Sequence, residues 1–107
     1  MNYAEASVRL QGVSSRKLCN NTYLQRRGDD IAVVLHGTDV ITLHPDGSFT
    51  LDSGGWQTAT TKNRMNRYMP VGCVLQEEGV WSVFPGGEDK CRYRDGMVID
   101  KDGTVAA

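Results

Sequence analysis

The residues of this chain with the clearest chemical potential lie in the segment WQTATTKNRMNR, which runs from Trp56 to Arg67. Its threonines are typical of a helix start, where a hydroxyl oxygen accepts a hydrogen bond from an otherwise unpaired amide. Free amides and the positive end of a helix dipole attract anions, and the segment carries cations without a single acid. The pattern therefore predicts a site for an anion or a protein partner. Its candidate residues are Trp56, Thr58, Thr60, Thr61, Lys62, Arg64, Asn66 and Arg67.

Three features of this segment have a second interpretation. The charged face of a short helix can be an ordinary solvated surface. Trp56 can be a stacking platform, although we expect a core anchor, because large aromatic side chains bury much apolar area. Arg64 lies at the flank of the helix, so it can pair inward with an acid such as Asp52 or point outward to a ligand.

No catalytic motif accompanies this segment. The chain has no GxSxG, no Walker loop and no HExxH sequence. His36 and His44 flank strand-like runs, and we expect hydrogen-bonding roles for them rather than general-base roles. The paired acids Asp29–Asp30 and Glu77–Glu78 fall at turn tips, where little burial is available to raise a carboxyl pKa. We therefore expect a protein that is not an enzyme and has no catalytic residues.

The three cysteines, Cys19, Cys73 and Cys91, are widely spaced and form no CxxC pair. This spacing suggests neither a zinc site nor a dithiol redox motif. We expect reduced, mostly buried thiols, no metal site and no cofactor.

The helix that positions the candidate site is predicted at about residues 60–69. Thr61, Met65, Tyr68 and Met69 follow one another at i, i+4, i+7 and i+8, which places them on one stripe. Pro70 ends the run, because the residue before a proline is disfavoured in helical conformation. A helix of about ten residues is not stable alone, so this stripe must pack on the rest of the fold.

The rest of the chain predicts short strands joined by tight turns. Alternation in SFTLD places Phe49 and Leu51 inward, and VWSVF places Trp81 and Val83 on one face. The expected strands cover residues 22–27, 31–35, 40–43, 48–52, 74–77, 80–84, 91–93 and 97–99. We predict an α+β fold: a small curled antiparallel sheet or open barrel of six to eight short strands, with one helix.

Length and composition predict a single domain over residues 1–107. Within it, residues 1–18 are expected to form a loop or flexible arm, and residues 86–107 a C-terminal hairpin. The first residues do not have the pattern of a signal peptide, and no apolar run approaches the length of a membrane helix. The net charge of −1 disfavours a general nucleic-acid coat but allows a local basic patch.

Residues 20–84 resemble a widespread family of small uncharacterised proteins of tailed bacteriophages. The resemblance lies in an NT pair, an LH-x-T-x-[VI]-x-T strand, a PDG turn, the block SGGW-x-T-x-TTK-x-R-[MI]-N and a later Q-x-x-x-x-W-x-V strand. The matching residues are Asn21, Thr22, Leu35, His36, Thr38, Val40, Thr42, Pro45, Asp46, Gly47, Ser53, Gly54, Gly55, Trp56, Thr58, Thr60, Thr61, Lys62, Arg64, Met65, Asn66, Gln76, Trp81 and Val83.

The resemblance implies a phage origin and the host cytoplasm, but no biochemical function. By analogy with other small phage proteins we expect an anti-defence or host-takeover binder. It would block a host defence protein, as an anti-CRISPR does, or sequester an anionic nucleotide signal.

Two alternatives stay open. One is binding of single-stranded nucleic acid through aromatic and arginine side chains; these are Tyr23, Trp81, Tyr93, Arg26, Arg27, Arg92 and Arg94. The other is a virion or assembly component that forms a homo-oligomer through an edge strand.

Overall fold

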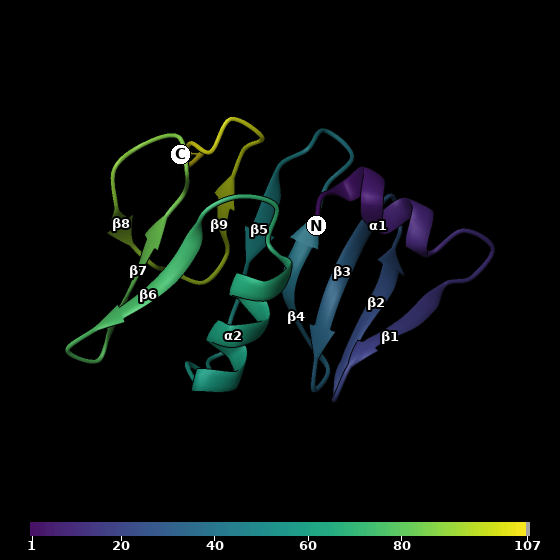
Figure 1. The fold of residues 1–107 in the computed structure, drawn as a ribbon, viewed down its shortest axis with the longest axis horizontal. Helices are drawn as coiled ribbons and strands as arrows, with labels where there is room; N and C mark the ends of the chain where they lie inside the picture. The colour runs from purple at the N-terminus through teal and green to yellow at the C-terminus, as the bar shows by residue number, and fades with distance from the viewer. Residues whose placement is uncertain (107) are drawn as a thin grey trace.

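The computed structural model describes residues 1–106 and has an α+β architecture with two antiparallel sheets. The larger sheet has the order β1-β2-β3-β4-β5-β9 and the smaller one β6-β7-β8 (Figure 1). The strands are β1 (Ser15–Cys19), β2 (Thr22–Arg27), β3 (Asp30–Leu35), β4 (Thr38–Leu43), β5 (Phe49–Leu51), β6 (Cys73–Glu77), β7 (Val80–Phe84), β8 (Cys91–Arg92) and β9 (Met97–Ile99). The helices are α1 (Tyr3–Arg9) and α2 (Ala59–Tyr68); neither has the length and apolar character needed to cross a bilayer.

The predicted α+β class and antiparallel strands are confirmed, and the sheet is not closed into a barrel. The single curled sheet of the prediction is instead divided in two. After α2 the chain forms the smaller sheet and then returns to pair β9 with β5, at the far side of the larger sheet from β1. The predicted C-terminal hairpin within residues 86–107 is also wrong, because β8 pairs with β7 and β9 pairs with β5. A tight turn shows where the chain reverses but not which strands pair, because pairing depends on long-range contacts.

α2 lies between the two sheets and contacts β3, β4 and β6 (Figure 1). It begins after the N-cap residue Thr58 and ends where Met69 turns extended before Pro70, so the predicted helix is confirmed to within one residue. The predicted stripe is also confirmed, since Met65 is fully buried and Thr61, Tyr68 and Met69 nearly so. The helix is thus held by burial of one face between two sheets.

The core lies on one side of the larger sheet, where both helices pack. Alternate residues of each strand point into it: Ile31 and Val33 from β3, and Phe49 and Leu51 from β5. The same cluster includes Trp81 and Val83 of β7, so it joins the two sheets. The predicted inward faces of residues 48–52 and 80–84 are therefore confirmed.

The prediction of a loop or flexible arm over residues 1–18 is wrong. α1 begins at a capping box, in which Glu5 N donates to Asn2 Oδ1 (2.9 Å) and Asn2 N donates to Glu5 Oε1 (3.1 Å). Its residue Ala6 and the C-cap residue Leu10 are fully buried, and β1 follows as the outer strand of the larger sheet. The helix is short, and its apolar residues are too few to give a clear periodic pattern.

The two edges of the larger sheet carry features that discourage pairing with another chain. β1 carries Arg16 and Lys17 and is interrupted by an irregularity before Cys19, and charge and bulges both discourage edge pairing. At the other end of the larger sheet, Val105 forms a bridge with Ile99 of β9. The homo-oligomer predicted to form through an edge strand stays a prediction.

Candidate functional site

The polar face of α2 is used mainly to hold the helix in place. Lys62 Nζ donates to Gln76 Oε1 of β6 (3.0 Å). Asn66 makes two bonds to the backbone of one β6 residue: Val74 N donates to Asn66 Oδ1 (2.6 Å), and Asn66 Nδ2 donates to Val74 O (2.9 Å). These two predicted binding residues thus connect α2 to the smaller sheet.

Arg64 points toward the larger sheet rather than toward a ligand. Its Nε donates to Thr22 Oγ1 of β2 (2.8 Å), and its Nη2 donates to the carbonyl oxygen of Asn20 (3.3 Å). Of the two predicted alternatives the inward one is correct, but the partners are neutral oxygens rather than Asp52. Arg67 lies over the ring of its neighbour Tyr68, 5.4 Å from the centroid.

The cations of α2 therefore do not converge on one anion site in this structure, and their role in binding a partner stays a prediction. Lys62 is held toward β6, Arg64 toward β2, and Arg67 lies in the last turn of the helix. The helical pattern separated apolar from polar positions, but it did not show that neighbouring elements flank the helix on both sides.

Trp56 is not the expected core anchor, because 68% of its surface is exposed. The buried tryptophan is Trp81, which is 3% exposed and packs edge-to-face on Tyr93 with ring centroids 5.2 Å apart. This packing buries Trp81 and Tyr93, so neither ring is available to stack on a nucleic-acid base in this structure. Of the three aromatic residues predicted to bind nucleic acid, only Tyr23 is exposed.

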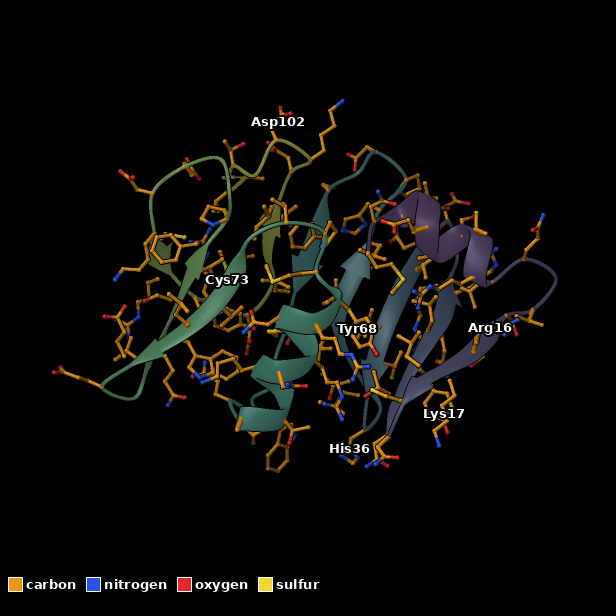
Figure 2. The ribbon with its side chains drawn as sticks, in the orientation of Figure 1. Arg16, Lys17, His36, Tyr68, Cys73 and Asp102 are labelled. Carbon is orange, nitrogen blue, oxygen red and sulfur yellow. The ribbon has the colours of Figure 1, made fainter. Side chains whose placement is uncertain are left out.

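Trp56 lies beside a pocket of about 350 Å³ at the start of α2. Three segments form it: the β3–β4 hairpin, whose exposed tip residue His36 is labelled in Figure 2, the turn after β5, and the first turn of α2. Its lining residues are Leu35, His36, Thr38, Val40, Ser53, Trp56, Thr58, Thr60 and Thr61. The pocket thus combines an apolar floor, several hydroxyl groups and one exposed indole.

Of the predicted site residues, Trp56, Thr58, Thr60 and Thr61 meet at this pocket, and Lys62, Arg64, Asn66 and Arg67 do not line it. Sequence reasoning missed the wall contributed by His36, Thr38 and Ser53, which comes from segments distant from α2 in the chain. His36 and Thr38 belong to the LH-x-T motif of the resemblance, and Ser53 belongs to its SGGW block. Their membership in these two motifs was the available signal, but their spacing in the sequence does not show that the motifs meet in the fold.

Asp95 fixes the turn that presents Trp56. Its Oδ1 accepts hydrogen bonds from Ser53 N (2.9 Å), Ser53 Oγ (2.7 Å) and Tyr93 Oη (2.6 Å). Burial by itself raises the pKa of this carboxyl, but the bonds from Tyr93 and Ser53 outweigh it and hold the pKa below its usual value. Next in the turn, a Cβ on Gly54 would lie 2.8 Å from Thr38 Cγ2, so only glycine fits against this wall of the pocket.

The first turn of α2 leaves two amides available beside the pocket. Thr58 satisfies two other amides near the start of the helix. Its Oγ1 accepts a hydrogen bond from Thr61 N (3.2 Å), and its carbonyl oxygen accepts one from Lys62 N (3.1 Å). Within residues 1–106, no acceptor is bonded to the amides of Ala59 and Thr60. Such amides, together with the helix dipole, favour a negatively charged group.

His36 occupies an unusual backbone conformation for its residue type. The φ angles of His36 (49°) and Gly37 (80°) place both residues of the β3–β4 turn in the left-handed region. Asparagine and glycine are the common residues in such a turn, and other side chains there carry a local strain. The strain places an exposed imidazole at the rim of the pocket.

Two other polar clusters lie away from the pocket. His44 bridges Asp30 Oδ1 (2.9 Å) and Thr50 Oγ1 (2.7 Å), which ties β3, β4 and β5 together, as expected for a strand-end histidine. Cys19 Sγ accepts from Tyr68 Oη (3.4 Å), and this bond lowers the thiol pKa against the opposing effect of burial.

The three cysteines are free and only partly buried, where we expected mostly buried thiols. Among residues 1–106 no group of three or more histidine, cysteine or acidic side chains is arranged to hold a metal ion.

Comparison with known proteins relates the chain to a bacteriophage family. No curated protein and no solved structure matches the chain. The family described as Kyanoviridae Gp96 protein matches residues 5–100, well beyond the 20–84 expected from the resemblance. The additional residues include most of α1, all of β1 and the C-terminal strands. The chain therefore belongs to the Kyanoviridae Gp96 protein family, a family of bacteriophage proteins.

Proposed function

We propose that this phage protein is a non-enzymatic binder that acts in the infected host, where it sequesters a small nucleotide signal of the host defence. The observation that carries the proposal is the exposed indole of Trp56 beside a pocket of about 350 Å³. Ligand sites are typically concave and largely apolar, with a few placed polar groups. This pocket has that composition.

The pocket offers a separate contact for each part of a nucleotide. The face of Trp56 suits a base, since stacking of a base on an aromatic ring contributes about 1–3 kcal/mol. The hydroxyls of Thr38 and Thr60 suit a ribose, and the amides of Ala59 and Thr60 suit a phosphate. Stacking would also cover one face of the exposed Trp56 indole.

Titration calorimetry against a panel of nucleosides, nucleotides and cyclic nucleotides tests this proposal. We expect binding of at least one nucleotide with a micromolar Kd, and quenching of Trp56 fluorescence while the buried Trp81 contributes a constant background. Trp56→Ala should weaken this binding at least tenfold, which is about 1.4 kcal/mol. Phe84→Ala removes an exposed aromatic of the smaller sheet and should leave it unchanged.

Failure of every nucleotide to bind at millimolar concentration would refute the nucleotide proposal. Equal binding by the wild-type protein and Trp56→Ala would show that the pocket is not the site.

A second candidate, the blocking of a host defence protein, is favoured by an apolar patch on the smaller sheet. Leu75, Val80 and Phe84 are 36%, 45% and 40% exposed. Leu75 of β6 lies opposite Ser82 of β7, so all three apolar residues belong to the same face. Exposed apolar groups of this kind are common at protein interfaces.

Affinity capture from infected host cells separates the two candidates. If a protein is blocked through this patch, Phe84→Asp should abolish its capture and Trp56→Ala should not. If a nucleotide is sequestered, Trp56→Ala should abolish its recovery from the purified protein and Phe84→Asp should not. Capture that survives both substitutions would contradict both candidates.

A further inference from the structure

We infer, on the basis of the proposed function, that the pocket at α2 takes a nucleotide with a single phosphodiester charge, of the nucleoside cyclic monophosphate class, and not a polyphosphate. The lining of the pocket contains no lysine, arginine, aspartate or glutamate. Its polar contacts are hydroxyls, amides and the imidazole of His36. The pocket therefore lacks the fixed positive charges that a polyphosphate requires.

The nearby cations are held elsewhere and cannot supply that charge without breaking existing contacts. Lys62 is bonded to Gln76, and Arg64 is bonded to Thr22 and Asn20. Arg67, nine residues beyond Thr58, lies about 13 Å along the helix at 1.5 Å per residue. Polyphosphate sites use lysine or arginine clamps and divalent cations, whereas this site has only the start of a helix.

The helix start matches a single negative charge. Its dipole is equivalent to about half a positive charge, and two amides, those of Ala59 and Thr60, are available for phosphate oxygens. These contacts suit one phosphodiester. They leave the additional charges of a diphosphate or triphosphate desolvated and unpaired, which costs binding free energy.

The size of the pocket also favours one nucleotide. A volume of about 350 Å³ lies at the lower end of the roughly 300–1,000 Å³ usual for ligand sites. One base can stack on Trp56 with its phosphate at the amides three and four residues along the chain. A cyclic dinucleotide has a second base, and the lining includes no second aromatic ring apart from the imidazole of His36.

Calorimetry with one base and a graded charge tests this inference. The series comprises the nucleoside, its 3′,5′-cyclic monophosphate, its 5′-monophosphate, its 5′-triphosphate and the corresponding cyclic dinucleotide, for adenine and for guanine. We expect the cyclic monophosphate to bind at least tenfold more tightly than the triphosphate, with a shallow dependence on salt concentration.

The outcomes distinguish this inference from the proposed function. If nucleotides bind through Trp56 but the triphosphate or the dinucleotide binds as tightly as the cyclic monophosphate, this inference is wrong and the proposed function stands. If no member of the series binds at millimolar concentration, both are wrong.

A gain-of-function pair locates the phosphate. Thr60 is exposed and lines the pocket in the first turn of α2, so Thr60→Lys adds a cation there, and Thr60→Gln is a neutral control of similar reach. We expect Thr60→Lys to raise triphosphate affinity at least tenfold over Thr60→Gln, with equal thermal stability. Equal triphosphate binding by both variants would show that the phosphate does not lie at the start of α2.

Discussion

Asn66→Ala provides the sharpest test of how α2 is attached. The side chain of Asn66 satisfies both backbone groups of Val74, at 2.6 and 2.9 Å, and Val74 is only 1% exposed. Alanine leaves this N–H and C=O without partners on an edge of the smaller sheet. A buried group left unpaired costs about 1–3 kcal/mol, and Asn66 itself is exposed enough for water to compensate in part. We therefore expect a loss of about 3 kcal/mol.

Urea denaturation followed by circular dichroism measures this loss. The expected value is a large part of the ~5–15 kcal/mol that stabilises a typical domain, so the variant should fold but unfold at a clearly lower urea concentration. Asn63→Ala is the matched control, because it removes the same side chain from the same helix, where Asn63 Oδ1 accepts an exposed hydrogen bond from Arg64 Nη1 (2.6 Å) and satisfies no buried backbone group. It should cost less than about 1 kcal/mol.

Asn66→Asp separates the donor from the acceptor. The carboxylate of the variant can still accept from Val74 N, but its second oxygen faces the Val74 carbonyl oxygen. In the wild-type protein the Asn66 amide donates a hydrogen bond at that position. The repulsion and the lost donor should leave Asn66→Asp less stable than the wild-type protein at neutral pH, by the same urea measurement. If the free energy of unfolding of Asn66→Ala lies within about 0.5 kcal/mol of the wild-type value, Asn66 does not hold the helix. Asn66 would then again be a candidate binding residue.

Three further predictions follow from the same contacts. Trp56→Ala should change the free energy of unfolding by less than about 1 kcal/mol, because the indole is mostly exposed; a loss of several kcal/mol by urea denaturation would restore it as a core residue. Arg64→Ala should cost about 1–3 kcal/mol by the same measurement, because it leaves the buried hydroxyl of Thr22 without its donor, and an unchanged midpoint would contradict this. The pKa of Asp95 is lowered in the fold, so its contribution is present above its unfolded pKa, about 4, and is lost as the pH falls through the lower folded value. Asp95→Asn should thus show a smaller drop in urea midpoint between pH 5 and pH 2 than the wild-type protein, and an equal drop would exclude Asp95 as a source of acid sensitivity.

The sequence by itself determined the elements that depend on neighbouring residues. The boundaries of α2 follow from the hydroxyl of Thr58 and the constraint of Pro70, both of which act within one helical turn. The strands after residue 20 follow from alternation and from turn residues, and these are local as well. α1 was missed although the Asn2–Glu5 capping box was present, because seven residues with one buried side chain give no periodic signal.

Only the tertiary structure decided which polar residues of α2 are available to a ligand. A helical pattern gives the angle of each side chain but not the positions of the neighbouring strands. Asn66 therefore looked like a contact residue until β6 was placed beside it. The same holds for Trp56: its exposure depends on the turn that Asp95 holds from 42 residues away in the chain. The pocket likewise exists only because long-range pairing brings the hairpin of His36 to the start of α2.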